Sequence, residues 1–489
     1  MQTLKYFPFF LLLLALFFGL HGAIENFGFM TFSEVLQTIF LIILALVACT
    51  SIVYFLCKDL LFAALITFFS SLWYLFFGSI QDCLKSFSFI NRYIFLLPIL
   101  MISTVFVAFF LKRKKSLQQK MAVYLNLLFL IFCIYDSIFI IGKLIIEKTL
   151  THQTISLNDN IVKNKPNVYF LLFDEYPGYK SLADSFYFKN DFFYSELTKD
   201  SFSTLPIFSN YNMTPYSMSS ILNMQYISSK TPSEVIDQKN LQERSKEIKN
   251  GKVFEEFSNM GYRINNYSIF DVHDQKSLGG NSFILGHDRL LTDKLLHNRL
   301  IKDIGWIFLT GKYSSSFFQN LYYGDVKNYN EKVEQLLQKK LTERDLTPQF
   351  VYAHFLIPHQ PYFYDSLGNA NALQNLEDDA TLRNKIVFLS YLKFCNKKIL
   401  NLEKSITKND PSGIIILMSD HGFRYYNNYS KFEPLNFNNF CATRNFNSSI
   451  SPDSAISNVN IFRLLFNRKY NQRISFLKDS ICVLQEPKN

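Results

Sequence analysis

Long apolar stretches occupy the N-terminal part of this 489-residue chain and constrain its fold more than any other feature. A helix needs about 20 apolar residues to cross the hydrocarbon core of a bilayer. Up to about residue 147, five stretches meet this requirement: Tyr6–Ile24, Val35–Cys57, Leu60–Ile80, Tyr93–Leu111 and Val123–Ile146. The sequence therefore predicts a five-helix transmembrane bundle in residues 1–147.

The positive charges between these stretches predict the orientation of the chain. Loops on the cytoplasmic side carry an excess of lysine and arginine. The loop from Lys112 to Lys120 carries five cationic residues, so we expect it in the cytoplasm. The loop 81–92 opposes this weakly, since Lys85 and Arg92 outnumber Asp82. An odd number of spans then makes this a multi-pass protein of the plasma (inner) membrane, with its C-terminal part extracytoplasmic.

The net charge of +10 could indicate nucleic acid, anionic lipid or an acidic substrate as a partner. The densest basic cluster, residues 112–115, lies between two apolar stretches. We therefore interpret it as a topology signal and expect the membrane, and no nucleic acid, as a partner. Asp136 lies near the middle of the fifth stretch, where a carboxylate is either functional or structural, that is, hydrogen-bonded to a neighbouring helix or simply protonated. We favour the second reading.

The composition becomes mixed after the fifth stretch. Residues 148–166 are polar and typical of a linker, and residues 167–489 are expected to form one domain. Three apolar runs predict buried strands, and helical patterns at 330–340 and 384–404 lie between them. The runs are Val168–Phe173, Phe350–Phe355 and Ile414–Met418. Strands that are apolar on both faces and alternate with helices predict an α/β fold with a mainly parallel sheet between helices.

Side chains that can do chemistry follow each of these runs. Asp174 and Glu175 follow the first, the second ends near His354 and continues to Pro358-His359-Gln360-Pro361, and Ser419-Asp420-His421-Gly422 follows the third. In open α/β sheets, ligands bind beyond the carboxyl ends of the strands. Each motif is weak alone, but three of them at strand ends of one domain predict a site there.

A fourth element is the stretch from Asn210 to Asn223, in which Thr214 precedes Pro215. Threonine is a good N-cap and proline is favoured at the first helical position, so we expect a helix to start here. Ser217 would lie near the cap. Taken alone, the stretch is a capped helix; read functionally, the Thr214 hydroxyl projects from a helix N-terminus that stabilises an anion.

Together, these motifs resemble the sulfatase-like branch of the alkaline phosphatase superfamily. The resemblance covers roughly residues 165–465 and rests on Pro166-Asn167-Val168, Asp174, the Thr214 helix, His-x-x-x-Pro-His-x-Pro and Ser-Asp-His-Gly. Within that branch, five N-terminal spans and an external domain look like the phosphoethanolamine transferases and the lipoteichoic acid synthases. The fold implied is a metal-dependent catalytic domain anchored to a membrane.

The resemblance implies specific roles for residues of this chain. Asp174, Thr214, Asp420 and His421 match the ligands of one divalent metal ion, zinc or manganese. Thr214 matches the nucleophile, and His359 matches a histidine that contacts the transferring group. His354, Glu175, Asn210 and Ser217 are further candidates for substrate binding, although adjacent strand residues point to opposite faces, which would turn Glu175 away from Asp174.

Three departures from the family pattern limit what the resemblance implies. Thr214-Pro215-Tyr216-Ser217-Met218 lacks the Cys/Ser-x-Pro-x-Arg pattern of classical sulfatases, which argues against formylglycine chemistry. No histidine follows His421, so a complete second metal site is not expected. Beyond residue 147 the chain has only Cys395, Cys441 and Cys482, which allow at most one disulfide.

The leading hypothesis is a membrane-bound phosphotransferase that moves a phospho-head-group from a phospholipid donor to an envelope glycan or lipid acceptor through Thr214. A sulfatase-like hydrolase or phosphodiesterase of the same superfamily is the alternative, since both share the first half-reaction. A non-catalytic membrane protein with a relic site is a third possibility, which the complete Asp/Thr/Asp-His set disfavours.

Overall fold

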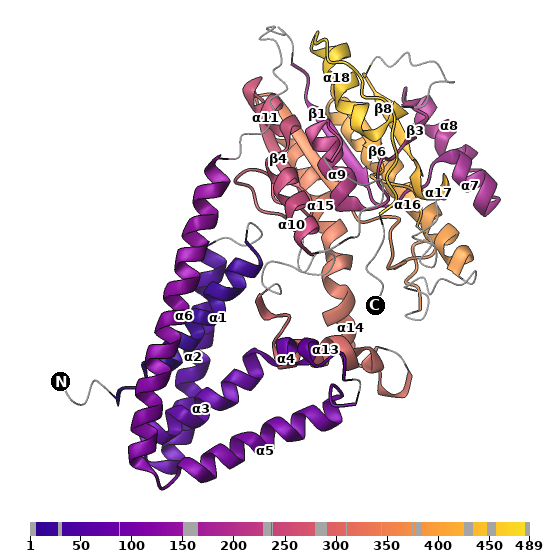
Figure 1. Ribbon diagram of the computed structural model, residues 1–489. Helices are drawn as coiled ribbons and strands as arrows, with labels where there is room; N and C mark the ends of the chain where they lie inside the picture. The colour runs from indigo at the N-terminus through magenta and orange to yellow at the C-terminus, as the bar shows by residue number, and fades with distance from the viewer. Residues whose placement is uncertain are drawn as a thin grey trace. The chain divides into compact units, whose positions relative to one another are not determined.

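The computed structural model describes residues 6–27, 32–87, 89–149, 165–227, 236, 238–278, 291–309, 311–343, 345–372, 376, 384–424, 434–446 and 456–484. The chain forms two compact units, which we call the membrane unit and the α/β unit (Figure 1). The membrane unit contains Met1–Gln153 and Leu285–Ser314, and the α/β unit contains Thr154–Ile284 and Ser315–Asn489. Most of the linker predicted at 148–166 lies outside the described residues.

The membrane unit is helical throughout its described residues. Its elements are α1 (Phe9–Glu25), α2 (Phe32–Cys57), α3 (Leu60–Leu75), α4 (Phe77–Cys83), α5 (Tyr93–Leu111), α6 (Lys115–Thr149) and α13 (Leu296–Ile304), with short 3₁₀ turns at Gly305–Phe308 and Gly311–Tyr313.

The number of spans differs from the five that the sequence predicts. Among the described helices, α2, α5 and α6 are long and apolar enough to cross a membrane, and α3 with α4 can count as a fourth, bent span. Helix α1 is apolar but has only 17 residues, fewer than the about 20 that a full crossing takes. Helix α5 has the predicted bounds, and the predicted first span is the helix that falls short.

The predicted third span is interrupted at Phe76, where the axes of α3 and α4 diverge by 56°. Gly78 gives the physical reason for this correction. Its N–H donates to the carbonyl of Lys294 over 2.8 Å, and a Cβ added at Gly78 would lie only 2.7 Å from the Cα of Lys294. Because only glycine permits this approach of two backbones, α4 packs against a late segment of the chain instead of continuing α3.

That late segment, residues 291–309 around α13, belongs to the membrane unit although 141 residues (150–290) separate it from α6. Arg299 pairs with both carboxylate oxygens of Asp82, at 3.1 and 2.8 Å. Lys294 pairs with Glu25 at 2.8 Å. Bidentate pairing of this kind fixes orientation as well as distance, so the segment is held in one register against the helices.

Asp136 lies between two helices of the membrane unit. Its side chain is buried, and its Oδ2 atom lies 3.4 Å from Nδ1 of His21 on α1. Further along the same two helices, Lys143 donates to the carbonyl of Ile24 over 2.8 Å. Asp136 therefore lies beside a polar side chain of a neighbouring helix, although its Oδ2 atom makes no hydrogen bond with the described residues.

In its described residues, the α/β unit contains a six-stranded sheet, a three-stranded sheet and the helices that cover them. Its strands are β1 (Val168–Phe173), β2 (Ser203–Thr204), β3 (Ile207–Phe208), β4 (Arg263–Tyr267), β5 (Gln349–Phe355), β6 (Ile414–Met418), β7 (Asn438–Asn439), β8 (Cys441–Arg444) and β9 (Ile456–Ser457). Its helices are α7 (Tyr179–Phe186), α8 (Asp191–Lys199), α9 (Thr214–Asn223), α10 (Gln238–Lys249), α11 (Lys252–Asn259), α14 (Ser316–Gln319), η4 (Asn320–Gly324), α15 (Asp325–Thr342), α16 (Asn384–Asn409), α17 (Pro434–Phe437), η6 (Asn458–Asn460) and α18 (Ile461–Lys469).

The large sheet has the order β2-β8-β6-β1-β5-β4, and its four strands from β6 to β4 are parallel. Val168 of β1 is in register with Phe350 of β5 and with Ile414 of β6. The three predicted strands are thus the centre of the sheet, and they are buried on both faces, as parallel strands with helical layers are. The predicted α/β class with a mainly parallel sheet is confirmed (Figure 1).

The cysteines of the α/β unit form no disulfide. The thiols of Cys395, Cys441 and Cys482 are all free, and the first two are buried. The single disulfide that the sequence would allow among these three cysteines is therefore not formed in the structure.

Glu403 on α16 makes the stability of the α/β unit depend on pH. Its side chain is fully buried, and burial, with Asp200 nearby, raises its pKa from 4.5 to about 8. A carboxyl with a raised folded-state pKa favours the folded state below pH 4.5, and this contribution is lost as the pH rises toward 8. Stability should therefore fall between these two pH values.

We expect Glu403→Gln to leave thermal stability nearly unchanged at pH 5 and to raise it at pH 9. The gain at pH 9 should be on the order of 5 kcal/mol, because glutamine imitates the protonated carboxyl without ionising. Thermal unfolding of the full-length protein in detergent at both pH values measures this. Asp200→Asn is the control, with a smaller gain in the same direction. Equal shifts at both pH values would contradict the assignment.

Candidate metal centre and active site

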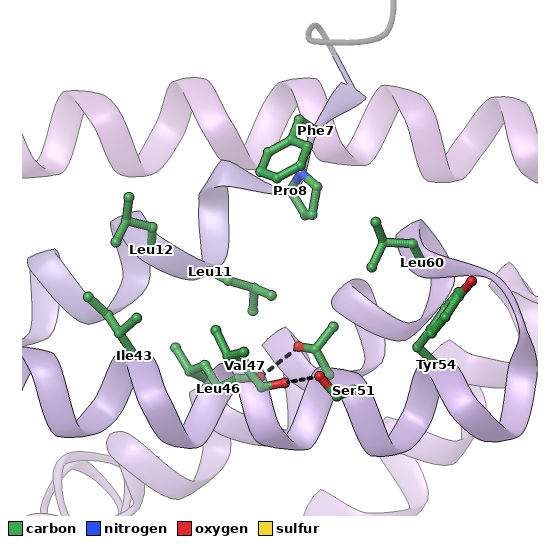
Figure 2. A pocket seen from close by; sticks show the side chains of 11 residues that line it. Phe7, Pro8, Leu11, Leu12, Ile43, Leu46, Val47, Ser51, Tyr54 and Leu60 are labelled. Atoms are coloured by element: carbon green, nitrogen blue, oxygen red, sulfur yellow. Dashed lines mark hydrogen bonds between the residues drawn. The ribbon is translucent and has the colours of Figure 1, made fainter.

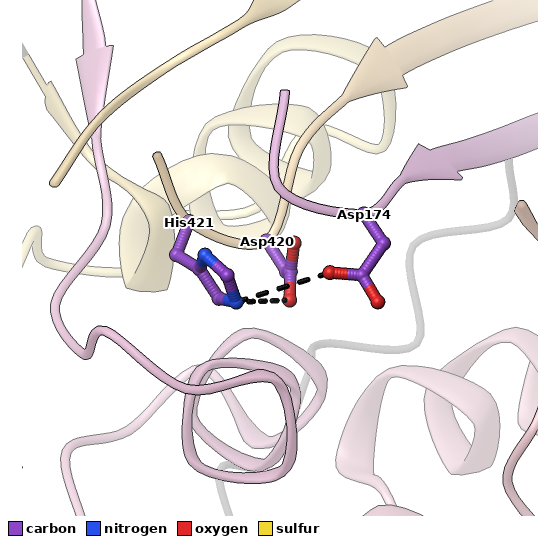
Figure 3. A group of neighbouring side chains, drawn as sticks. All are labelled: Asp174, Asp420 and His421. Carbon is purple, nitrogen blue, oxygen red and sulfur yellow. Dashed lines mark ion pairs between the residues drawn. The ribbon is translucent and has the colours of Figure 1, made fainter. Parts of the chain in front are cut away.

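Two adjacent strands place three buried ligand groups at one edge of the large sheet. Asp174 is the first residue after β1, and Asp420 and His421 follow β6 directly after Ser419. Since β1 and β6 are parallel and in register, their carboxyl ends meet. All three side chains are fully buried, and Figure 3 shows their polar ends converging from the two strands.

The distances between the ligand atoms define a compact group. Nε2 of His421 lies 3.3 Å from Oδ2 of Asp420 and 3.8 Å from Oδ1 of Asp174. The Thr214 hydroxyl oxygen lies 3.3 Å from the same Nε2 and 3.4 Å from the same Oδ1. Four donor atoms, three oxygens and one nitrogen, therefore surround one point.

These separations suit a tetrahedral divalent cation. Zinc binds nitrogen and oxygen ligands at about 2.0–2.2 Å, so neighbouring ligands in a tetrahedron stand about 3.3–3.6 Å apart. The four separations of 3.3, 3.3, 3.4 and 3.8 Å match this spacing closely. Direct hydrogen bonds are usually shorter, about 2.7–3.2 Å between the heavy atoms. The residues present therefore fit a metal ion.

Neighbouring hydrogen bonds turn the free atoms of these ligands toward that point. Nδ1 of His421 lies 2.7 Å from the carbonyl of Gly422, so it carries the proton and leaves Nε2 as the acceptor. Oδ1 of Asp420 accepts the Glu175 N–H over 3.2 Å, while its Oδ2 is buried with no hydrogen-bond partner among the described residues. An unpartnered buried carboxylate oxygen is costly, and a cation would satisfy it.

The pKa values of Asp174 and Asp420 also indicate that a cation binds between these two carboxylates. Burial, together with the charge of Asp420, raises the pKa of Asp174 well above its usual value. Burial would also raise the pKa of Asp420, but the imidazoles of His421 and then His354, followed by a hydrogen bond from Thr214, hold that pKa below its usual value. Two buried carboxylates this close resist ionising together unless positive charge lies between them.

Helix α9 brings Thr214 into the group. The helix begins at Thr214 itself, Met213 is its N-cap, and Pro215 follows in the first turn. The predicted N-cap is thus one residue too late along the chain. The Thr214 side chain is only 5% exposed and lies at the end of the helix where backbone N–H groups are not used within the helix. An anion that reaches this oxygen also meets the positive end of the helix dipole.

A second group of side chains, Glu175, His359 and Arg424, lies beside the first. Nε2 of His359 is 3.4 Å from Oε2 of Glu175 and 3.1 Å from Nη2 of Arg424. The backbone N–H of Arg424 also donates to Oε1 of Glu175 over 2.7 Å. Burial and the charge of Asp420 have the largest effects on the pKa of Asp174, and both raise it. The His359 imidazole and the Arg424 guanidinium oppose them and lower this pKa through their charge. The second group of side chains therefore stabilises the ionised form of a candidate metal ligand.

The direction of Glu175 corrects the sequence-based expectation. Strand β1 ends at Phe173, and Glu175 has a φ of +63°, in the left-handed region. The alternation of strand side chains therefore stops before this residue, and its carboxylate lies with His359 and Arg424 instead of on the opposite face.

Arg424 is a residue that the sequence analysis missed. It stands four positions after Asp420, and its guanidinium is a planar donor suited to phosphate and sulfate oxygens. The signal was present, since an arginine soon after a Ser-Asp-His-Gly motif is an anion-binding group close to a strand end. The spacing alone does not predict the contact, because it does not show that the loop after Gly422 turns back toward His359.

The other predicted substrate-binding residues have structural contacts. His354 is buried on β5, burial lowers its pKa to about 4, and its Nε2 lies 3.9 Å from Oδ2 of Asp174. The Ser217 hydroxyl donates to the carbonyl of Asp420 over 2.6 Å. Asn210 bonds the carbonyl of Ser480 and the N–H of Val459, at 2.8 and 3.0 Å. Asn210 and Ser217 therefore brace the site, and His354 stands behind Asp174 as a neutral group.

No protein-family model and no curated protein match the chain. Solved structures resemble it at low identity. The C-terminal periplasmic domain of EcEptC from Escherichia coli, in complex with zinc, is 12% identical with a TM-score of 0.41, over 65% of this chain and 86% of that one.

Two further structures have comparable scores. The periplasmic domain of phosphoethanolamine transferase EptC from Campylobacter jejuni is 12% identical with a TM-score of 0.37, over 64% of this chain and 92% of that one. A sulfatase-like protein from Bacteroides thetaiotaomicron, described as a candidate sulfatase, is 11% identical with a TM-score of 0.40, over 65% and 74%. Similarity at this level does not assign an activity to this chain. An activity has to be argued from the residues of the chain itself.

Proposed function

We propose that the α/β unit is a metal-dependent phosphotransferase of the sulfatase-like kind, with Thr214 as nucleophile. The observation that carries the proposal is the position of the Thr214 oxygen, 3.3–3.4 Å from two ligand atoms of a buried Asp-Asp-His group. A threonine hydroxyl is a weak nucleophile in water and needs activation. A bound divalent ion, zinc or manganese, would lower the pKa of that hydroxyl and neutralise charge on the phosphoryl group.

The reaction has two half-reactions that share one covalent intermediate. The Thr214 oxygen attacks the phosphorus of a lipid phosphodiester, the bond from phosphorus to the lipid alcohol breaks, and the alcohol leaves with a proton. The hydroxyl of an acceptor then attacks the phosphothreonine, and Thr214 regains its proton. Phosphoryl transfer asks mainly for positioning and for neutralisation of charge, which buried ligands and a helix N-terminus can provide.

The cluster of Glu175, His359 and Arg424 would bind the rest of the phosphoryl group. The Arg424 guanidinium can donate two hydrogen bonds to non-bridging oxygens, and His359 can donate one or protonate the leaving oxygen. In the structure these two side chains contact each other at 3.1 Å and share Glu175. Glu175 would hold them in place until an anionic substrate replaces it as their partner.

The membrane unit supports a lipid donor over a soluble one. A chain with several apolar helices holds its catalytic domain at a membrane surface, where the donor is concentrated. The basic loop at 112–120 supports an extracytoplasmic α/β unit in the plasma membrane, so the acceptor would be a glycan or lipid of the cell envelope. Donor and acceptor then meet outside the cytoplasm.

Mass spectrometry of the purified, metal-loaded protein tests the proposal. We expect incubation with phospholipids that carry an isotopically labelled head group to add the labelled phospho-head-group to Thr214. An added envelope glycolipid should remove the label from the protein and take it up.

The outcomes separate transfer from hydrolysis. Label that leaves the protein equally fast in water as with acceptor would establish the hydrolase alternative. Substrate cleavage with no adduct on Thr214, even after rapid acid quenching, would mean that water is the nucleophile and that the proposal is wrong.

A further inference from the structure

A large cavity lies within the membrane unit, between helices α2, α3 and α5 and the segment around α13. Its volume is about 1000 Å³, which places it at the upper end of the about 300–1,000 Å³ that small-molecule sites occupy. All of its lining residues belong to the membrane unit, and it is separate from the site described above.

The two ends of this cavity differ in polarity. At one end lie Glu34 in the first turn of α2, Trp73 and Tyr74 near the end of α3, and Thr292 before α13. These helix ends lie together because α2 and α3 run in opposite directions and α13 packs against α3 and α4. Tryptophan and tyrosine are typical of the membrane–water interface.

The rest of the cavity is lined mainly by apolar side chains. Ala45 and Cys49 of α2 and Met101 and Val105 of α5 line it farther along these helices from that end, and their side chains are exposed within the protein itself. From Glu34 to Cys49 the helix rises by about 22 Å, at about 1.5 Å per residue. Half of a bilayer's hydrocarbon core is about 15 Å thick. The cavity is therefore long enough for an acyl chain together with the start of its head group.

A second pocket of the membrane unit serves as a comparison (Figure 2). It is about 380 Å³ in volume and is lined by residues of α1, α2 and the start of α3. Its hydroxyls at Thr50 and Ser51 donate to the carbonyls of Leu46 and Val47 in their own helix, at 2.7 and 2.8 Å. No charged side chain and no tryptophan lies among the described lining residues of this pocket, and Tyr54 is its single interfacial aromatic residue. It therefore lacks the combination of a carboxylate and paired aromatic side chains that marks the larger cavity.

We propose that the cavity between α2, α3 and α5 binds one diacyl phospholipid of the surrounding bilayer, with an acyl chain against Ala45 and Met101. Its head group lies at the end formed by Glu34, Trp73 and Thr292. Glu34 is the one charged side chain among the described lining residues, so a zwitterionic head group is favoured over an anionic one. The inference concerns the membrane unit alone and does not depend on phosphotransfer by the α/β unit.

Photocrosslinking of the full-length protein in nanodiscs tests the site. The probe is a phosphatidylcholine with a diazirine near the middle of one acyl chain. We expect its adducts on the wild type to map to peptides of α2 and α5. Met101→Trp should reduce crosslinking on α2 several-fold, because the indole fills the apolar end.

Ile102→Trp is the matched control, since Ile102 is the next residue of α5, is equally exposed at 67% against 69%, and does not line the cavity. Ala45→Trp and Leu44→Trp form a second pair on α2, which keeps the test valid if one variant fails to fold. Equal crosslinking within both pairs would overturn the proposal.

The head-group preference is tested separately by competition. Unlabelled phosphatidylcholine should displace the probe several-fold better than phosphatidylglycerol does, and Glu34→Gln should remove that difference. If phosphatidylglycerol competes better than phosphatidylcholine in the wild type, the head group does not lie at Glu34.

Discussion

Thr214→Ala is expected to lower phosphotransfer at least about 10⁴-fold, the scale seen when a covalent nucleophile is removed. The substitution deletes the hydroxyl that, among the described residues, lies within 3.4 Å of both Asp174 and His421. Thr214→Ser keeps the oxygen but loses the methyl group that restricts its rotation, so a loss of at most about 10²-fold is expected. Turnover of a labelled phospholipid donor under saturating metal measures both.

The control for Thr214 is Ser220→Ala in the same helix. The Ser220 hydroxyl donates to the carbonyl of Gln225 over 2.8 Å and takes no part in the ligand group. Its removal should change stability slightly and leave turnover within about threefold, since one hydrogen bond contributes about 1 kcal/mol. If Thr214→Ala keeps full activity, a water molecule performs the attack and no covalent transfer takes place.

Asp420→Ala is expected to empty the metal centre. Even an indirect partner of a metal ligand is worth about 10–100-fold in metal affinity, so loss of a ligand should cost more than that. Metal content per chain after dialysis, measured by elemental analysis, should fall to a small fraction of the wild-type value. The metal-free variant should remain folded, because the substitution also removes one of two buried carboxylates that repel each other.

His359→Ala is the matched control for Asp420→Ala. His359 is buried next to Glu175 and Arg424 and lies outside the Asp-Asp-His group. It should slow turnover and leave the metal content unchanged. Equal metal content in Asp420→Ala and the wild type would show that the ligand assignment is wrong.

Much of the fold follows from local patterns in the sequence. Val168–Phe173 and Ile414–Met418 were expected as buried strands with those bounds, since a short run that is apolar on both faces fits little else in an α/β domain. The residues after those runs, Asp174 and Asp420, converge because parallel strands end at one edge. The candidate ligands could be chosen from the sequence for this reason.

Other parts of the site lie in loops, whose sequences have no periodic pattern of apolar residues from which a conformation could be predicted. The turn after β1 takes Glu175 into the left-handed region and brings its carboxylate to His359. The loop after Asp420 brings the Arg424 guanidinium to the same place. Loop geometry follows from contacts with distant residues, so neither position could be inferred from spacing.

The membrane unit shows the same division. Apolar length alone determined that α2, α5 and α6 are long enough to span a bilayer, because hydrocarbon admits only segments whose backbone groups bond internally. Only the tertiary structure decided that α3 breaks at Phe76 and that residues around α13 join this unit. Beside that break, the backbones of Gly78 and Lys294 meet although they are more than 200 residues apart in the sequence, and Arg299 pairs with Asp82 of α4. Local patterns specify helices and strands through their own periodicity, whereas a contact between distant backbones exists only once the chain has folded.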